Sequence, residues 1–499
     1  MRVLCEADGG EGSADFTLLT KLLHEELPGV SVTPMVFSKA AESVSGVGDD
    51  SSGSARFAMG SLFAQPISRE AVHLATRFRH SADFERNRFV ALKLLNRVDL
   101  TGTFRLLERE VYFQAALLQA AEMLLKEAPT IVVFRVTPHE FLPWVVSQLA
   151  SFMKIEVLHF QPCSMAPTMI PKLMSGKKLL ISDIAARHSS VASETRTILR
   201  NQIARLSGGL SPRYMDQQRN QDSRQRGIRS RVLAIVKSVA WLRARRFPES
   251  VDFSGHRNWS GMAVNAQRII LTRSLQKNLR DSIRELGTAT DKDQPYSVYA
   301  MHYEPERTSL PDGLPVDTQV DALLYIRTVI PPGEKVWVKE HYSQQSSALR
   351  GFLGRSPLVY QLIAKMPQTD FAPVGVNLVE LVRNARAVFT LTGTIAIEAS
   401  LMGVPVYYFG DPWWSDLPGS ARIDFRRPKA FPPAIEGNKA DVSVFLEDKV
   451  MNSMVPGVAG ETLSTIERRL GPLPSGFKEA ELAAIAGCVI ALLQGKTPR

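Results

Sequence analysis

The chain has 499 residues, of which 44% are apolar and 22% charged, and its formal net charge is +10. This length exceeds what one hydrophobic core usually supports and the composition is globular, so we expect two domains and exclude a disordered chain. The cysteines Cys5, Cys163 and Cys488 are far apart in sequence, which argues against a disulfide framework or a zinc site.

The two ends of the chain carry short apolar runs. Residues 1–7 include Glu6 within their apolar run, which favours a first strand over a signal peptide. The run at 483–493 is shorter than the roughly 20 residues that a membrane span needs. We therefore expect a cytoplasmic protein without a spanning helix.

In the first half, the pattern of apolar residues predicts strands and helices in alternation. Residues 2–7 are typical of a strand, residues 16–27 of a helix, and residues 104–127 of a long helix. The β-branched run at 130–136, a following helix and a strand at 155–160 form a βαβ pattern, which favours a parallel sheet.

Residues 171–294 carry little strand signal and are predicted as a helical insertion and interdomain connection. A second alternation of strands and helices follows, with strands at 296–303, 335–341, 387–392 and 405–410. The predicted fold class is α/β, with two Rossmann-like doubly wound domains. We place the domains at residues 1–170 and 295–475, with a C-terminal helix at 476–499.

Positive charge is concentrated between residues 211 and 247, where ten Lys or Arg stand against two Asp. The remainder is close to neutral, so no nucleic-acid partner is expected. The stretch that begins at Ile228 and ends at Phe247 has apolar residues at helical spacing with basic residues elsewhere on the wheel. Such a helix suits peripheral contact with an anionic membrane surface. The alternative is a helix packed on the protein's own core, with its arginines in solvent.

The most informative segment, residues 387–410, combines a buried strand, a tight turn and a helix. In the turn Thr392-Gly393-Thr394, the glycine permits a close approach and the start of the helix favours an anion. Glu398 follows one helical turn after Thr394, so its carboxylate is predicted to accept hydrogen bonds from the two hydroxyls of a ribose. Alternatively, Thr394 only caps the helix and Glu398 faces solvent, although the end of a parallel strand favours a ligand site.

Two other strand ends of the second domain carry charged residues. Lys339, Glu340 and His341 end its second strand, where Lys339 is expected to neutralise a phosphate and His341 to donate to it or to a base carbonyl. Glu306 follows the first strand and is a further candidate to face the cleft. For each of these groups, a position in solvent is the alternative.

Four motifs follow one another within residues 296–414, about a quarter of the chain. They are His-x-x-Pro-Glu from His302, a Gln at Gln319, Pro-Gly before the Val-Lys-Glu-His strand, and Thr-Gly-Thr-x-x-x-Glu-Ala with Gly-x-Pro from Thr392. This ordered set resembles the bacterial capsular polysaccharide biosynthesis family, which includes the capsule β-Kdo transferases and has the GT-B architecture. Where that family usually has Pro after Lys-Glu-His, this chain has Tyr342.

The resemblance implies a glycosyltransferase that moves a sugar, in that family Kdo, from a nucleotide-sugar donor to a glycan or glycolipid acceptor. Two Rossmann domains would face each other across a cleft, with the acceptor held by residues 1–170 and the donor by residues 295–475. A lipid-linked acceptor would suit an enzyme that attaches peripherally to the inner membrane.

Sugar transfer needs a base that takes the proton of the acceptor hydroxyl. Two loops of the first domain follow strands and hold the candidates His139, Glu140, Asp8 and Glu11. The alternative for His139 is a cap on the helix that follows it. No Asp-x-Asp metal motif appears in an apolar setting and no cofactor is expected, so helix N-termini and Lys339 would stabilise the leaving phosphate.

Two other functions fit the same fold, because a fold alone does not determine chemistry. A sugar-nucleotide epimerase would need a paired acid and base near the sugar and no lipid-facing helix. A non-catalytic protein of polysaccharide assembly would keep the fold without turnover.

Overall fold

The computed structural model describes residues 1–7, 12–38, 55–58, 62–63, 65–97, 105–177, 179, 189–209, 261–286, 294–346, 349–373, 376–424 and 438–495. Two predictions therefore lie outside the described residues. One concerns Asp8 and Glu11 as candidate bases, and the other concerns the basic stretch from Ile228 to Phe247.

The first of two sheets has seven strands, in the order β13-β6-β5-β4-β1-β2-β3. Their bounds are β1 Arg2–Glu6, β2 Ser31–Ser38, β3 Ala55–Ala58, β4 Ile131–Phe134, β5 Glu156–Pro162, β6 Thr168–Leu173 and β13 Val455–Pro456. From β3 to β5 the neighbours are parallel, whereas β6 pairs antiparallel with both β5 and β13. The predicted βαβ unit is confirmed, since β4 and β5 are parallel neighbours joined by a helix.

The second sheet has six strands, in the order β12-β11-β10-β7-β8-β9, and all of its pairs are parallel. Their bounds are β7 Tyr296–Ala300, β8 Lys335–Lys339, β9 Thr369–Phe371, β10 Val388–Thr390, β11 Val406–Tyr408 and β12 Ser420–Arg422. Numbered within the sheet this is the strand order 3-2-1-4-5-6 of dinucleotide-binding folds, which reverses direction between its first and fourth strands.

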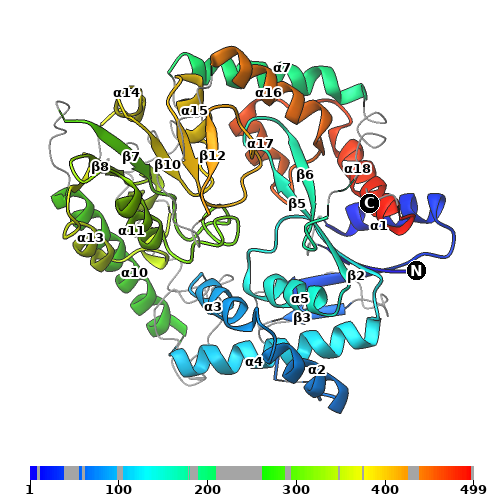
Figure 1. Ribbon diagram of the computed structural model, residues 1–499. Helices are drawn as coiled ribbons and strands as arrows, with labels where there is room; N and C mark the ends of the chain where they lie inside the picture. Colours follow the sequence, from blue (N-terminus) through cyan, green and yellow to red (C-terminus); the bar gives the residue numbers. More distant parts are fainter. Residues whose placement is uncertain are drawn as a thin grey trace.

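Helices cover both sheets (Figure 1). Those associated with the first half are α1 Gly12–Glu26, α2 Arg69–Arg79, α3 Phe84–Leu95, α4 Leu106–Glu127, α5 Phe141–Phe152 and, from the end of the chain, α18 Phe477–Leu493. The others are α7 Ser189–Ser207, α10 Gly261–Leu286, α11 Gln319–Val329, α12 Tyr342–Gln345, the 3₁₀ turn η2 Gly351–Leu353, α13 Pro357–Ile363, α14 Leu378–Arg383, α15 Ile395–Leu401, α16 Lys439–Asn452 and α17 Leu463–Leu470.

The end of the chain returns to the first half. Strand β13 adds to the edge of the first sheet, and α18 packs against α1 (Figure 1). Between the two sheets in sequence, α7 packs on α15 and α16, while α10 packs on α13. Both of these helices lie within the stretch predicted as a helical insertion, but residues 210–260 lie outside the described ranges, so the insertion stays a prediction.

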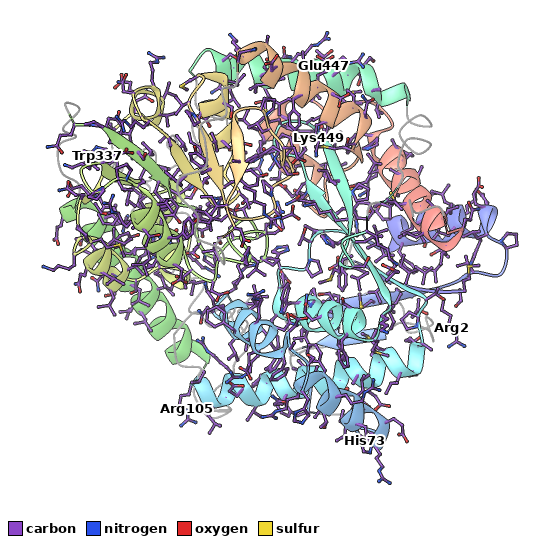
Figure 2. The ribbon with its side chains drawn as sticks, in the orientation of Figure 1. Arg2, His73, Arg105, Trp337, Glu447 and Lys449 are labelled. Atoms are coloured by element: carbon purple, nitrogen blue, oxygen red, sulfur yellow. The ribbon has the colours of Figure 1, made fainter. Side chains whose placement is uncertain are left out.

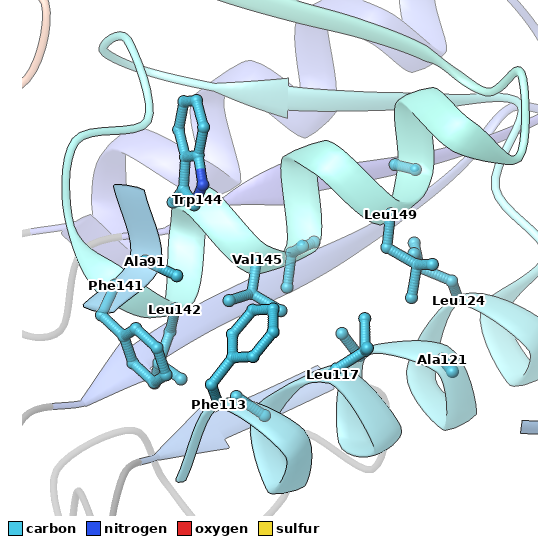
Figure 3. Packing of buried hydrophobic residues seen from close by; sticks show 14 of the residues in the cluster. Ala91, Phe113, Leu117, Ala121, Leu124, Phe141, Leu142, Trp144, Val145 and Leu149 are labelled. Carbon is cyan, nitrogen blue, oxygen red and sulfur yellow. The ribbon is translucent and has the colours of Figure 1, made fainter. Parts of the chain in front are cut away.

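Each half has its own apolar core. In the first, Phe113 and Leu117 of α4 face Val145 and Leu149 of α5, and all four side chains are nearly inaccessible to water (Figure 3). In the second, Trp337 of β8 is fully buried within the sheet region (Figure 2). Burial of such large apolar side chains stabilises the fold by about 1.5–3 kcal/mol for each side chain, so each core stabilises the half that contains it.

Two largely parallel sheets covered by helices, each with its own apolar core, confirm the predicted α/β fold class. Among the described helices, none is both long enough and apolar enough to pass through a bilayer.

Candidate functional site

A pocket of about 1490 Å³ lies where the two sheets face each other. Its walls include Glu6, the last residue of β1, and Arg135, which follows β4. They also include His302 and Thr392, which follow β7 and β10. Each pair marks the reversal of strand order in its own sheet, the point at which open α/β sheets bind ligands. The pocket is therefore the expected ligand site of both halves at once.

The structure brings the predicted site residues together in this pocket. All ten of them that lie in described ranges line it: His139, Glu140, Glu306, Lys339, Glu340, His341, Thr392, Gly393, Thr394 and Glu398. The sequence spaces these residues over 260 positions, and the parallel topology gathers them because their strands end at the same edges.

His302 joins the two central strands of the second sheet. Its Nε2 accepts a hydrogen bond from the Thr392 amide at 3.1 Å and also lies 3.1 Å from the Thr390 hydroxyl. A Cβ at Gly393 would lie 2.7 Å from that hydroxyl and 3.4 Å from the His302 ring. Position 393 therefore favours glycine, because a side chain there would clash with the Thr390 hydroxyl.

Sequence reasoning gave His302 no role of its own. Gln319 accepts from its amide and donates to its carbonyl, at 2.6 and 3.1 Å. Burial, together with His341 and Arg355, lowers the pKa of His302 to about 3, so the ring is neutral at neutral pH.

Glu398 differs from the other carboxylates of the pocket. It is 6% exposed and lines the pocket from α15, and no residue in the described ranges makes a hydrogen bond or ion pair with its carboxyl group. Burial raises its pKa to about 7. A buried carboxyl group that faces a pocket without a protein partner is costly, and donors on a ligand would offset that cost.

Thr394 stands at the N-cap of α15, but its hydroxyl makes no capping hydrogen bond. The capping alternative is therefore not seen. The Thr392 hydroxyl is already used, since it donates to the Thr308 carbonyl at 2.6 Å. Of the two threonines of the turn, Thr394 has the hydroxyl that can serve a ligand.

His341 presents a hydrogen-bond donor to the pocket. Its Nδ1 accepts from the Ser343 amide at 3.2 Å, which caps α12. Burial, Arg355 and Lys339 lower the pKa of His341 to about 4, so the ring is neutral and its proton sits on Nε2. Lys339 donates to the Pro373 carbonyl at 3.0 Å and lines the same wall.

Glu340 belongs to a buried charged cluster around Arg355, a residue that sequence reasoning missed. Glu340 accepts from the Tyr360 hydroxyl at 2.7 Å and lies 3.5 Å from the Arg355 guanidinium, which also lies 3.3 Å from Glu304. Arg355 donates to the His302 carbonyl at 2.8 Å. The cluster thus holds the loops after β7 and β8 together. Its partners are scattered in sequence, so no local motif could reveal it.

Glu306 is exposed and lines the pocket from the loop after β7, where it accepts from the Thr308 hydroxyl at 2.9 Å. On the opposite wall, Glu140 is the N-cap residue of α5 and makes no side-chain capping bond. Both carboxylates lie near enough to Arg97 to raise its pKa.

His139 is arranged as a base. Its Nδ1 lies 2.8 Å from the Thr137 carbonyl, which can only accept, so Nδ1 carries the proton and Nε2 offers a lone pair. Burial, together with Arg97 and Arg307, lowers the pKa of His139 to about 4, against the hydrogen bond to Thr137 and the charge of Glu140. The ring is neutral at neutral pH and can accept a proton. The alternative that His139 caps α5 is not seen, since Glu140 occupies the N-cap.

The described ranges contain no group of three His, Cys, Asp or Glu side chains that could hold a metal ion. The polar groups of the pocket are instead suited to a ligand with hydroxyls and a phosphate. Glu398 can accept, while His341, Lys339 and Thr394 can donate.

No protein-family model matches this sequence, and no curated protein matches it either. Among solved structures, a β-Kdo 2,7-transferase, KpsC of Thermosulfurimonas dismutans, matches 68% of this chain and 80% of its own at 12% identity, with a TM-score of 0.27. The UDP-GlcNAc 2-epimerase of Methanocaldococcus jannaschii matches 99% of this chain and 100% of its own at 11% identity, with a TM-score of 0.20. The glycotransferase of kitacinnamycin matches 100% of this chain and 99% of its own at 12% identity, with a TM-score of 0.18. Likenesses at this level assign no function to this chain.

Proposed function

We propose that this protein is a glycosyltransferase that moves a sugar from a nucleotide-sugar donor to a glycan or glycolipid acceptor. The observation that carries the proposal is the buried Glu398 carboxyl, which has no protein partner in the described ranges. It lines a pocket between the points where the strand order reverses in two largely parallel sheets. A vicinal diol such as a ribose offers the two donors that such a carboxylate accepts.

The donor is proposed to lie against the second sheet. Its ribose contacts Glu398, and its phosphate lies near Lys339, the His341 Nε2–H and Thr394. The pocket exceeds the roughly 300–1,000 Å³ of most small-molecule sites. It has room for an acceptor between the donor and the first sheet.

In the reaction, an acceptor hydroxyl oxygen attacks the anomeric carbon and the bond from that carbon to the phosphate oxygen breaks. The electron pair of the broken bond passes to the phosphate, and the hydroxyl proton passes to Nε2 of His139. The lone pair on that nitrogen and the neutral ring favour His139 over Glu140 for this role.

A thermal-shift panel of CMP, UDP, GDP and their sugars tests donor binding, because a ligand specific for the folded state raises its stability. We expect one base to stabilise the protein above the others. The stabilising nucleotide sugar, incubated with an acceptor glycan, should then give free nucleotide and a lengthened glycan. If the same nucleotide sugar is converted to an isomer without any acceptor, the protein is an epimerase. If no nucleotide stabilises it, the proposal fails.

A further inference from the structure

Arg97 lies at the junction of the two halves, two residues beyond the end of α3. Its guanidinium donates to the carbonyl of His139 in the first half and, at 3.0 Å, to the carbonyl of Leu310 in the second. It also lines the pocket. One side chain therefore connects the loop of the candidate base with the loop that follows β7.

The charge of Arg97 is balanced differently from that of three other arginines that line the pocket. Arg135, Arg307 and Arg469 each form an ion pair with a carboxylate, respectively Asp15, Asp312 and Glu461. Arg97 donates to two carbonyl groups, and within the described ranges no carboxylate lies within 4.0 Å of it. Burial lowers its pKa to about 10, although Glu140, Glu306 and Glu304 raise it from further away.

A partly buried guanidinium without a close counter-ion is costly to the folded protein, and an anionic ligand would offset that cost. The position of Arg97 indicates which anion. Arg97 donates to the carbonyl of Leu310, which lies in the loop after β7. In the same loop, the Thr308 carbonyl accepts a hydrogen bond from the Thr392 hydroxyl. Thr392 belongs to the turn that we propose lies beside the donor phosphate.

On the basis of the proposed function, we propose that Arg97 is a catalytic residue that contacts the donor phosphate from the first half of the protein. As the bond between the anomeric carbon and the phosphate oxygen breaks, negative charge accumulates on the phosphate. The Arg97 guanidinium lies where it can stabilise that charge. Its bonds to two carbonyls from opposite walls hold it in place before the ligand arrives.

Calorimetry with UDP and uridine, CMP and cytidine, and GDP and guanosine separates the contact with phosphate from the contacts with base and ribose. For the pair whose nucleotide binds wild type, Arg97→Gln should lose at least tenfold of the nucleotide affinity and none of the nucleoside affinity. Arg97→Lys keeps the positive charge but lacks the paired N–H donors of the guanidinium, so it should lose less nucleotide affinity than Arg97→Gln. Arg88→Gln is the matched control, because Arg88 lies on α3, the helix that precedes Arg97, pairs with Glu110 and does not line the pocket.

Unchanged nucleotide affinity in Arg97→Gln would overturn the proposal. An equal loss for nucleotide and nucleoside in both Arg97 variants would show a structural role only, and would overturn it too. If wild type binds none of UDP, CMP and GDP, the proposed function has failed and the role of Arg97 fails with it. If wild type binds a nucleotide and Arg97→Gln is normal, only the role of Arg97 is wrong.

Discussion

The carboxyl edges of the two sheets face the same pocket, but they treat their charges differently. At the edge of the first sheet, Arg135 lies 3.5 Å from Asp15 and 3.9 Å from Glu481, and Lys478 lies 2.7 and 3.1 Å from the same two carboxylates. At the edge of the second sheet, Glu398 is buried without such a partner. The charges around Glu481 at the first edge neutralise one another and stabilise the fold, whereas the Glu398 carboxyl group at the second edge is left for a ligand.

This difference teaches that burial of charge alone does not mark a binding site. Glu481 is more completely buried than Glu398, at 0% against 6% exposure. Its oxygens accept from the Val458 amide at 2.8 Å and from Lys478, so they have no need of a ligand. Glu398 differs because its buried carboxyl group makes no hydrogen bond or ion pair with any residue in the described ranges.

The largest expected effect concerns the candidate base. With the donor and acceptor found by the nucleotide panel, His139→Gln should slow transfer by about 10²–10⁴-fold while nucleotide affinity stays unchanged. Since the pKa of His139 is lowered to about 4, the wild-type rate should stay level down to about pH 5 and fall below it as Nε2 takes up a proton. The exposed His80 provides the control variant His80→Gln. Full activity in His139→Gln would remove this residue from the reaction.

Breaking the self-neutralised edge should cost stability and leave the ligand site intact. Glu481→Ala leaves Arg135, Lys478 and the Val458 amide without one of their partners, so we expect a loss of about 3–5 kcal/mol in the free energy of unfolding. Urea unfolding measures it, with the exposed Glu479→Ala on the same helix as control. Nucleotide affinity should not change in Glu481→Ala. If this variant loses affinity but not stability, Glu481 serves the ligand and the contrast with Glu398 is wrong.

Glu398 should make stability depend on pH in a definite direction. Burial raises the pKa of Glu398 to about 7 in the folded state, so between about pH 4.5 and 7 the folded protein holds a proton on this group that the unfolded chain has lost. The stability that this proton contributes is complete below about pH 4.5 and is lost as pH rises through 7. From pH 5 to pH 8 this group accounts for a loss of roughly 2–3 kcal/mol. The loss should be smaller by that amount in Glu398→Gln. Parallel stability curves for the two proteins would show that Glu398 is not buried as an acid.

Much of the second half could be predicted from its sequence because its information is local. The turn from Thr392 to Thr394 and the residue Glu398 lie within seven positions, on a strand and helix whose apolar pattern is strong. The strands β7, β8, β10 and β11 were predicted within a few residues of their observed ends. Parallel topology then brings the strand ends together.

What could not be predicted depends on contacts between distant residues. Arg355 and Arg97 have ordinary sequence surroundings, and their importance comes from loops up to 213 positions away. The return of β13 to the first sheet rests on two residues, which are too few to show a strand pattern. Local spacing therefore identifies the ligand edge, and only the folded chain shows the side chains that hold the edge in place.

The central claim is that Glu398 receives the ribose of a nucleotide, and calorimetry on Glu398→Ala tests it most directly. Loss of the paired contacts should weaken binding of the stabilising nucleotide by about 1–3 kcal/mol. The exposed Glu380→Gln on α14 should bind as wild type does. Because the diol donates to the ionised carboxylate, wild-type affinity should also rise with pH through about 7 more steeply than that of Glu398→Ala. Equal affinity and equal pH dependence in wild type and Glu398→Ala would contradict the account.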